Sequence, residues 1–203
     1  MENRKEQIIE TALKRFSHFG FHKTTMNEIA DDLRITKANL YYYYADKSTL
    51  ILDAICKLCG DIHEGEKAII SEYAGDLIDT MHKVLEFRSE YMRRYYVLHI
   101  NENLDWIKGI DITQTMDRFQ KIEIELLKDL FHKAVDEGVL LLKDVDKAAE
   151  TFVEIQKGLS IVHTVSDIIT GIPSERNVDK IIDSQKRAIN LIFGARILSK
   201  KTE

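Results

Sequence analysis

The residues best suited to chemistry on another molecule are four consecutive tyrosines, Tyr41 to Tyr44, which follow Lys37 and Ala38. On a helix each residue turns about 100° from the last, so four consecutive rings point around the whole circumference and cannot all be buried on one side. Phenolic hydroxyls and an ammonium group can contact phosphates, and a small residue lets the backbone approach a groove. The pattern predicts a short helix whose exposed side binds DNA.

A second set of reactive residue types is Cys56, Cys59 and His63, which have Cys-x-x-Cys spacing with a histidine one helical turn later. Both sulfurs lie on the stripe that the apolar residues of this helix define, and a free cysteine is commonly a buried apolar residue. A closed zinc site needs more ligands than the neighbouring sequence offers. We therefore expect no metal and no cofactor, and a thiol or metal sensor remains an alternative.

The elements that carry these residues are expected to be helices. The chain of 203 residues has one Pro and nine Gly, and its apolar residues recur at spacings of three and four. We predict an all-α fold, in which residues 1–46 form a three-helix helix-turn-helix domain and residues 47–203 form a larger helical bundle.

Capping signals place the short helices around the tyrosines. Gly20 is predicted to end the first helix near Phe19. Thr25 and Glu28 have the spacing of a capping box, and Thr36 is a second cap before the tyrosine helix. Two short helices joined by a tight turn are a helix-turn-helix.

The charge of the chain is unevenly distributed. Residues 1–50 hold eight Lys and Arg against seven Asp and Glu, whereas the remainder holds 21 against 27, so the net charge of -5 belongs to the second part. Phosphate binding would therefore depend on local placement. The charged N-terminus lacks a signal-peptide pattern, no apolar run reaches membrane-span length, and two cysteines give no disulfide framework, so we expect a cytoplasmic protein without a membrane partner.

Over roughly residues 5 to 55 the sequence resembles the N-terminal signature of the tetracycline-repressor (TetR) family of bacterial regulators. The residues that carry the resemblance are Ala12, Phe16, Gly20, Phe21, Thr24, Thr25, Ile29, Ala30, Thr36 to Tyr44, Lys47 and Leu50. Two positions depart from the family pattern: Arg34 stands where a turn glycine is usual, and Tyr44 stands where Phe is usual. The turn must therefore hold a left-handed or strained residue without glycine.

The resemblance implies a DNA-contacting set. Its members are Thr25, Thr36, Lys37, Ala38, Asn39, Tyr41, Tyr42, Tyr43 and Lys47. Lys37, Ala38 and Asn39 are the residues that could read bases, and the others are expected at phosphates. Leu40 and Tyr44 are four apart and should point into the core of the domain.

The resemblance also implies that the bundle encloses a cavity for a small-molecule effector. Candidate lining residues are Phe87, Tyr91, Tyr95, His99, Trp106, Met116, Phe119 and Phe152, and ordinary core packing is the more frequent role for each. Buried tyrosine and histidine side chains would be the places where a polar ligand group is recognised.

The last two helices are predicted to pair two copies of the chain. The segment 148–169 is apolar on nearly every side and should be buried all round, and a helix from about 177 to 198 repeats the pattern. One subunit cannot cover that much apolar surface, which favours a two-fold four-helix interface. The resulting hypothesis is a homodimeric repressor, not an enzyme, that leaves a palindromic operator when an effector binds. A helical small-molecule carrier is the other alternative.

Overall fold

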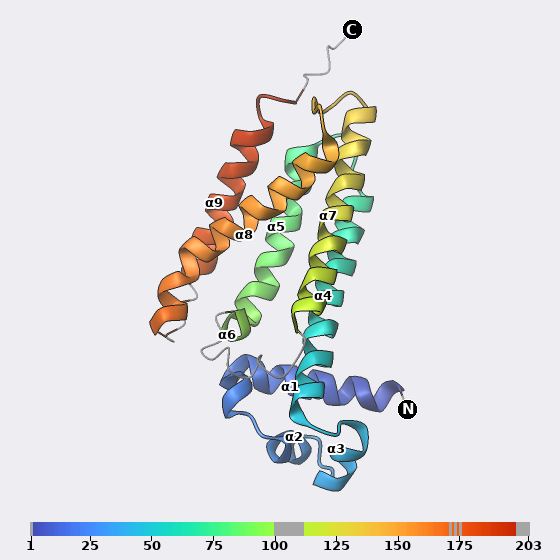
Figure 1. The fold of residues 1–203 in the computed structure, drawn as a ribbon, viewed down its shortest axis with the longest axis vertical. Helices are drawn as coiled ribbons and strands as arrows, with labels where there is room; N and C mark the ends of the chain where they lie inside the picture. The colour runs from blue at the N-terminus through green and yellow to red at the C-terminus, as the bar shows by residue number, and fades with distance from the viewer. Residues whose placement is uncertain (1, 100–111, 171, 173, 175, 198–203) are drawn as a thin grey trace.

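A computed structural model gives the structure, and it describes residues 2–99, 112–170, 172, 174 and 176–197 (Figure 1). The helices of this part of the chain are α1 (Glu2–Lys23), α2 (Met26–Asp32), α3 (Lys37–Tyr43), α4 (Lys47–Ser71), α5 (Leu77–Arg94), α6 (Tyr96–His99), α7 (Ile112–Asp136), α8 (Val145–Thr170) and α9 (Arg176–Phe193). The predicted all-α fold is confirmed. None of these helices combines the length and the apolar character that a membrane crossing requires.

Helices α1, α2 and α3 form a unit at one end of the molecule, and α4 runs from this unit into the bundle (Figure 1). Their shared core includes Ile8, Phe16, Ile29 and Leu40, all inaccessible to solvent. The first turns of α4 complete this core through Leu50, Ile51 and Ala54. Helix α4 therefore contributes to two cores: its first turns pack in the N-terminal core, and its last turns pack in the core of the bundle.

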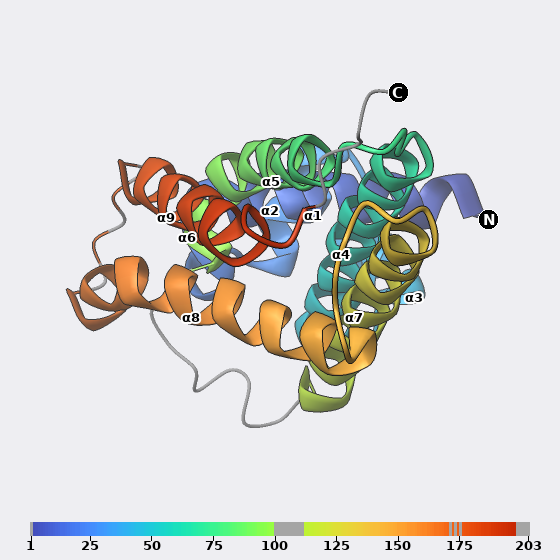
Figure 2. The same ribbon diagram turned by 90° about the horizontal axis from the view of Figure 1, so that it is seen from above.

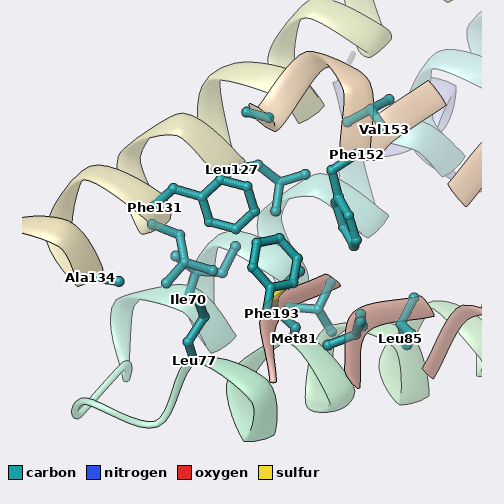
Figure 3. Close-up of a cluster of buried hydrophobic side chains, with 14 of the residues drawn as sticks. Ile70, Leu77, Met81, Leu85, Leu127, Phe131, Ala134, Phe152, Val153 and Phe193 are labelled. Atoms are coloured by element: carbon teal, nitrogen blue, oxygen red, sulfur yellow. The ribbon is translucent and has the colours of Figure 1, made fainter. Parts of the chain in front are cut away.

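The bundle is built from α5, α7, α8 and α9 together with the rest of α4, as the view along its length shows (Figure 2). Helix α5 packs against α9 and α4, and α7 packs against α8. At its centre Phe131, Phe152 and Phe193 meet with ring centroids 5.2 to 6.1 Å apart (Figure 3). Tilted and edge-on aromatic contacts of this kind add to the stabilisation from apolar burial.

One expectation about helices is confirmed and one needs correction. Gly20 leaves helical geometry with a φ of 74° and a ψ of 169°, so the first regular helix ends there as predicted, and a further helical segment continues α1 beyond the kink to Lys23. The prediction that the segment 148–169 is buried all round is wrong for the single chain, since Val162 is 67% exposed and Ile169 is 79% exposed. The reason is position: α8 lies at the edge of the bundle, covered from one side by α7 and α9 (Figure 2).

Candidate nucleic-acid interface

The first short helix of the motif, α2, begins at a complete capping box. The Thr25 side chain accepts a hydrogen bond from the Glu28 amide at 3.3 Å, and the Thr25 amide donates to Glu28 Oε2 at 2.8 Å. These hydrogen bonds hold the pKa of Glu28 below its usual range. The predicted cap is confirmed, and it fixes where the chain enters the motif.

The turn between α2 and α3 is held without glycine. Arg34 takes the left-handed conformation with a φ of 53°, and its amide donates to the Asp31 carbonyl at 3.0 Å. Thr36 then caps α3 by accepting from the Asn39 amide at 3.2 Å. Leu40 and Tyr44 are fully buried beneath α3, as predicted, so this seven-residue helix is anchored by its inner side.

The outer side of α3 carries the residues predicted to contact DNA. Lys37, Ala38 and Asn39 are exposed at the start of the helix. Tyr42 is 69% exposed, and Tyr41 is 40% exposed with its ring centroid 5.6 Å from Lys37 Nζ. Two aromatic rings and an ammonium group therefore lie together on the exposed side of α3.

Tyr43 has a different position from its two neighbours. Its ring is half-buried, packs against the N-terminal core and meets Tyr42 edge-on with centroids 5.2 Å apart. Tyr43 therefore supports the orientation of Tyr42, and it is the least exposed of the three tyrosines predicted at phosphates.

An open hollow of about 320 Å³ joins the ends of α1, α2, α3 and α4 on this side. It is lined by His22, Thr24, Thr25, Met26, Asn27, Lys37, Tyr41 and Lys47. Four of the predicted contact residues, from three helices, thus come together at one place. Sequence reasoning missed His22 and Asn27. The signal that could have found them is their place next to the Thr25 cap.

Lys47 is positioned by the end of α1. Its ammonium group donates to the His22 carbonyl at 3.5 Å and is partly buried, which lowers the pKa of Lys47 although Glu28 opposes the shift. A partly dehydrated ammonium group at the edge of the hollow binds an anion more strongly than a fully hydrated one.

Arg15 offsets part of the acidic charge of α2. This residue of α1 holds Asp32 through its Nε at 2.5 Å and holds Glu28 through its Nη1 at 3.4 Å. One guanidinium compensates one of the two negative charges, which reduces the repulsion that α2 would exert on an anionic partner.

The candidate effector residues are spread over the bundle. Phe152 lines a small cavity between α5, α7, α8 and α9. Phe87 fills the space that a side chain at Gly65 would need and lies 5.2 Å from the ring of Tyr91, which in turn stacks on Tyr95. Met116 is 40% exposed, and Arg118 lies over the ring of Phe119. The His99 side chain and Trp106 lie outside the described residues.

The cavity has about 20 Å³ of free space, room for about one water molecule. Most of its wall is apolar, from Met81, Val84, Leu85, Leu127, Leu130, Phe152 and Ile189. Its polar groups are the ion pair of Arg88 with Glu123 at 2.8 Å and the amide of Gln156, which is 3% exposed and whose two polar atoms have no hydrogen-bond partner. A buried unpaired amide is costly, so this is a place where a polar group can bind.

Cys56 and Cys59 lie half-buried on α4. Burial raises the pKa of both thiols, that of Cys59 to about 11. Within the described residues no cluster of three or more His, Cys, Asp or Glu is arranged to hold a metal ion. Because the thiolate is the form that reacts and binds metals, these environments disfavour a sensor role.

Residues 8–54 match the family model of bacterial regulatory proteins of the tetR family. A curated relative is the biofilm operon icaADBC HTH-type negative transcriptional regulator IcaR of Staphylococcus aureus (strain Newman), 27% identical over 127 residues that cover 61% of this chain and 68% of the relative.

Solved structures share the fold over nearly the whole chain. A transcriptional regulator from Cytophaga hutchinsonii ATCC 33406 superimposes with a TM-score of 0.79 at 24% identity, covering 95% of this chain and 98% of the other. A transcriptional regulator from Saccharomonospora viridis, determined in complex with choline, gives a TM-score of 0.65 at 17% identity, covering 95% and 98%.

Proposed function

We propose that the chain is a TetR-family transcriptional regulator, whose family model residues 8–54 match, and that it acts as a homodimeric, ligand-responsive repressor of a palindromic operator. The observation that carries the proposal is the two-sided construction of α3. Leu40 and Tyr44 are buried on its inner side, while Lys37, Ala38 and Tyr42 are exposed on its outer side. Operator binding implies a site of action at the chromosome, in the cytoplasm.

We assign the contacts by chemistry. Lys37, Ala38 and Asn39 would meet base edges in the major groove, since they occupy the first turn of the recognition helix. The side chains proposed at phosphates are those of Thr25, Thr36, Tyr41, Tyr42, Tyr43 and Lys47. The DNA-binding domain would be residues 1–46 with the first turns of α4 as its support, and the remainder would bind effector and partner.

The proposed dimer surface is an apolar stripe along α8. Exposed apolar residues recur along α8 at helical spacing: Ile155, Ile161, Val162, Val165, Ile168 and Ile169. Gly158 lies in the same stripe, and a Cβ there would meet nothing within 4 Å of the chain, so a second backbone could approach closely. Contiguous exposed apolar surface of this kind is typical of interfaces. In a dimer joined along α8 and α9, the α3 helices of the two copies would lie in successive major grooves of the operator.

For the effector we propose the cavity lined by Phe152 and Gln156, which would have to expand on binding because it now has room for about one water molecule. The guanidinium of Arg88 is already held by Glu66 at 2.6 Å and Glu123 at 2.8 Å, which favours an uncharged or cationic effector over an anionic one. The choline complex of the Saccharomonospora viridis regulator is in line with a cation. Expansion would shift the population toward dimers whose recognition helices do not fit the operator.

The test is selection of an operator from random DNA, followed by binding measurements with variants. Lys37→Ala should lower operator affinity by roughly 5- to 150-fold, the loss of one good base contact. Lys143→Ala, which removes an exposed lysine from the opposite end of the molecule, should bind as the wild type does. If Lys37→Ala together with Tyr42→Phe left the affinity unchanged, the carrier alternative would replace the repressor.

A further inference from the structure

One buried carboxylate connects three helices at the lower end of the bundle. Asp167 of α8 is 5% exposed, and its Oδ2 accepts hydrogen bonds from the Tyr96 hydroxyl at 2.6 Å, the Ser174 amide at 2.9 Å and Asn177 Nδ2 at 2.9 Å. Tyr96 and Asn177 are themselves 2% and 7% exposed. The cluster therefore joins α6, α8 and α9 away from water.

The Tyr96 end of this cluster lies next to the DNA-binding unit. Tyr96 is the first residue of α6, and α6 packs against α1. Tyr95 and Leu98, on either side of it, pack against the N-terminal core. A hydrogen bond at Tyr96 thus acts on the segment that holds α1 in place under the bundle (Figure 1).

The Asp167 end lies next to the proposed dimer surface. Ile168 and Ile169, the two residues that follow it on α8, are 44% and 79% exposed and belong to the apolar stripe. One hydrogen bond therefore links α6, the helix that packs against α1, to the helix that carries the proposed dimer surface.

Because the hydrogen bond between Tyr96 and Asp167 is buried, separating α6 from α8 is costly. Burial alone would raise the pKa of Asp167, but the hydrogen bonds outweigh it and the pKa is lowered, so the carboxylate is ionised at neutral pH. Moving α6 away would remove the Tyr96 hydrogen bond and leave the buried carboxylate with two of its three donors, which costs more than stretching an exposed pair. The exposed pair of Arg93 with Asp179, between α5 and α9, offers no comparable resistance.

We propose that Asp167 and Tyr96 are positioning residues for operator recognition, which fix the DNA-binding unit relative to the α8–α9 dimer surface and so set the separation of the two recognition helices. This inference rests on the dimeric operator binding proposed above. In this proposal, the hydrogen bonds around Asp167 determine which distance between operator half-sites the dimer prefers.

The experiment compares two DNA duplexes, the operator selected from random DNA and the same operator with one base pair inserted at its centre. The wild type should prefer the first. Tyr96→Phe, which removes only the hydroxyl, and Asp167→Asn should each reduce the ratio of the two affinities by roughly 2- to 30-fold, the range of coupling changes seen for residues outside binding sites. Tyr73→Phe is the matched control, because it also removes one buried phenolic hydroxyl, and Tyr73 lies between α4 and α5, outside the Asp167 cluster.

The ratio separates positioning from simple destabilisation, since a partly unfolded variant loses affinity for both duplexes equally. Circular dichroism and sedimentation establish that each variant is folded and dimeric at the temperature used. If the wild type discriminates between the duplexes and both variants keep the full ratio, the inference is overturned while the proposed function stands. If the wild type itself shows no preference, the dimeric reading of a palindrome fails and the inference fails with it.

Discussion

Replacing Val162 by aspartate tests the apolar stripe of α8. Val162 is 67% exposed in the single chain, and full burial of a valine is worth about 1.5–3 kcal/mol, so contact with a partner would contribute about 1–2 kcal/mol per copy. Two-fold symmetry doubles this to about 2–4 kcal/mol, which corresponds to roughly a 30- to 1,000-fold change in the dimer dissociation constant. The aspartates add the cost of burying two like charges, so these values are lower limits.

Sedimentation over a range of protein concentrations measures the dissociation constant directly. The matched control is Leu141→Asp, which introduces the same charge at an apolar residue that is 64% exposed and lies outside the stripe. We expect Val162→Asp to be monomeric at concentrations where the wild type and Leu141→Asp are dimeric, and to bind the operator weakly. If Val162→Asp dimerises as the wild type does, the apolar stripe of α8 is not the dimer surface.

Three further predictions concern stability. Arg88→Met should lower the free energy of unfolding by about 3–5 kcal/mol, because it leaves Glu66 buried without its partner, and adding Glu66→Leu should restore much of the loss in denaturant titrations. The pKa of Asp167 is lower in the folded protein than its ordinary value of 3.8 despite burial, so on acidification the carboxylate is protonated in the unfolded chain before it is protonated in the folded protein. The free energy of unfolding should therefore fall as the pH drops through about 4, and it should fall less in Asp167→Asn. Thr36→Ala should speed hydrogen exchange of the Asn39 amide roughly fivefold through loss of the cap, whereas Thr36→Ser should not.

The helix-turn-helix was predictable because its determinants are local. The caps at Thr25 and Thr36 act within three residues of the chain, and the burial of Tyr44 follows from its spacing of four from Leu40. A left-handed or strained backbone at Arg34 was expected from the family resemblance, since a glycine is usual at this position, and Arg34 has a φ of 53°.

The bundle was less predictable because its features depend on contacts distant in sequence. The hydrogen bond of Tyr96 to Asp167 spans 71 positions, and no local pattern indicates it. Apolar periodicity indicated more apolar surface than one subunit could cover, but it could not indicate which side of α8 the bundle would leave exposed, so Val162 was not singled out. The cavity polar groups were missed for the same reason: Gln156 carries no signal until α5 and α7 are packed around it.

Salt titration of operator binding tests the central claim most directly. Each copy presents Lys47, the lysine proposed at a phosphate, at the hollow beside α3, so a dimer neutralises at least two phosphates. The logarithm of the association constant should fall linearly with the logarithm of salt concentration, with a slope of about −2 or steeper, because about 0.9 counterions are released per phosphate neutralised. Operator binding that does not respond to salt would contradict a DNA-binding role for this surface.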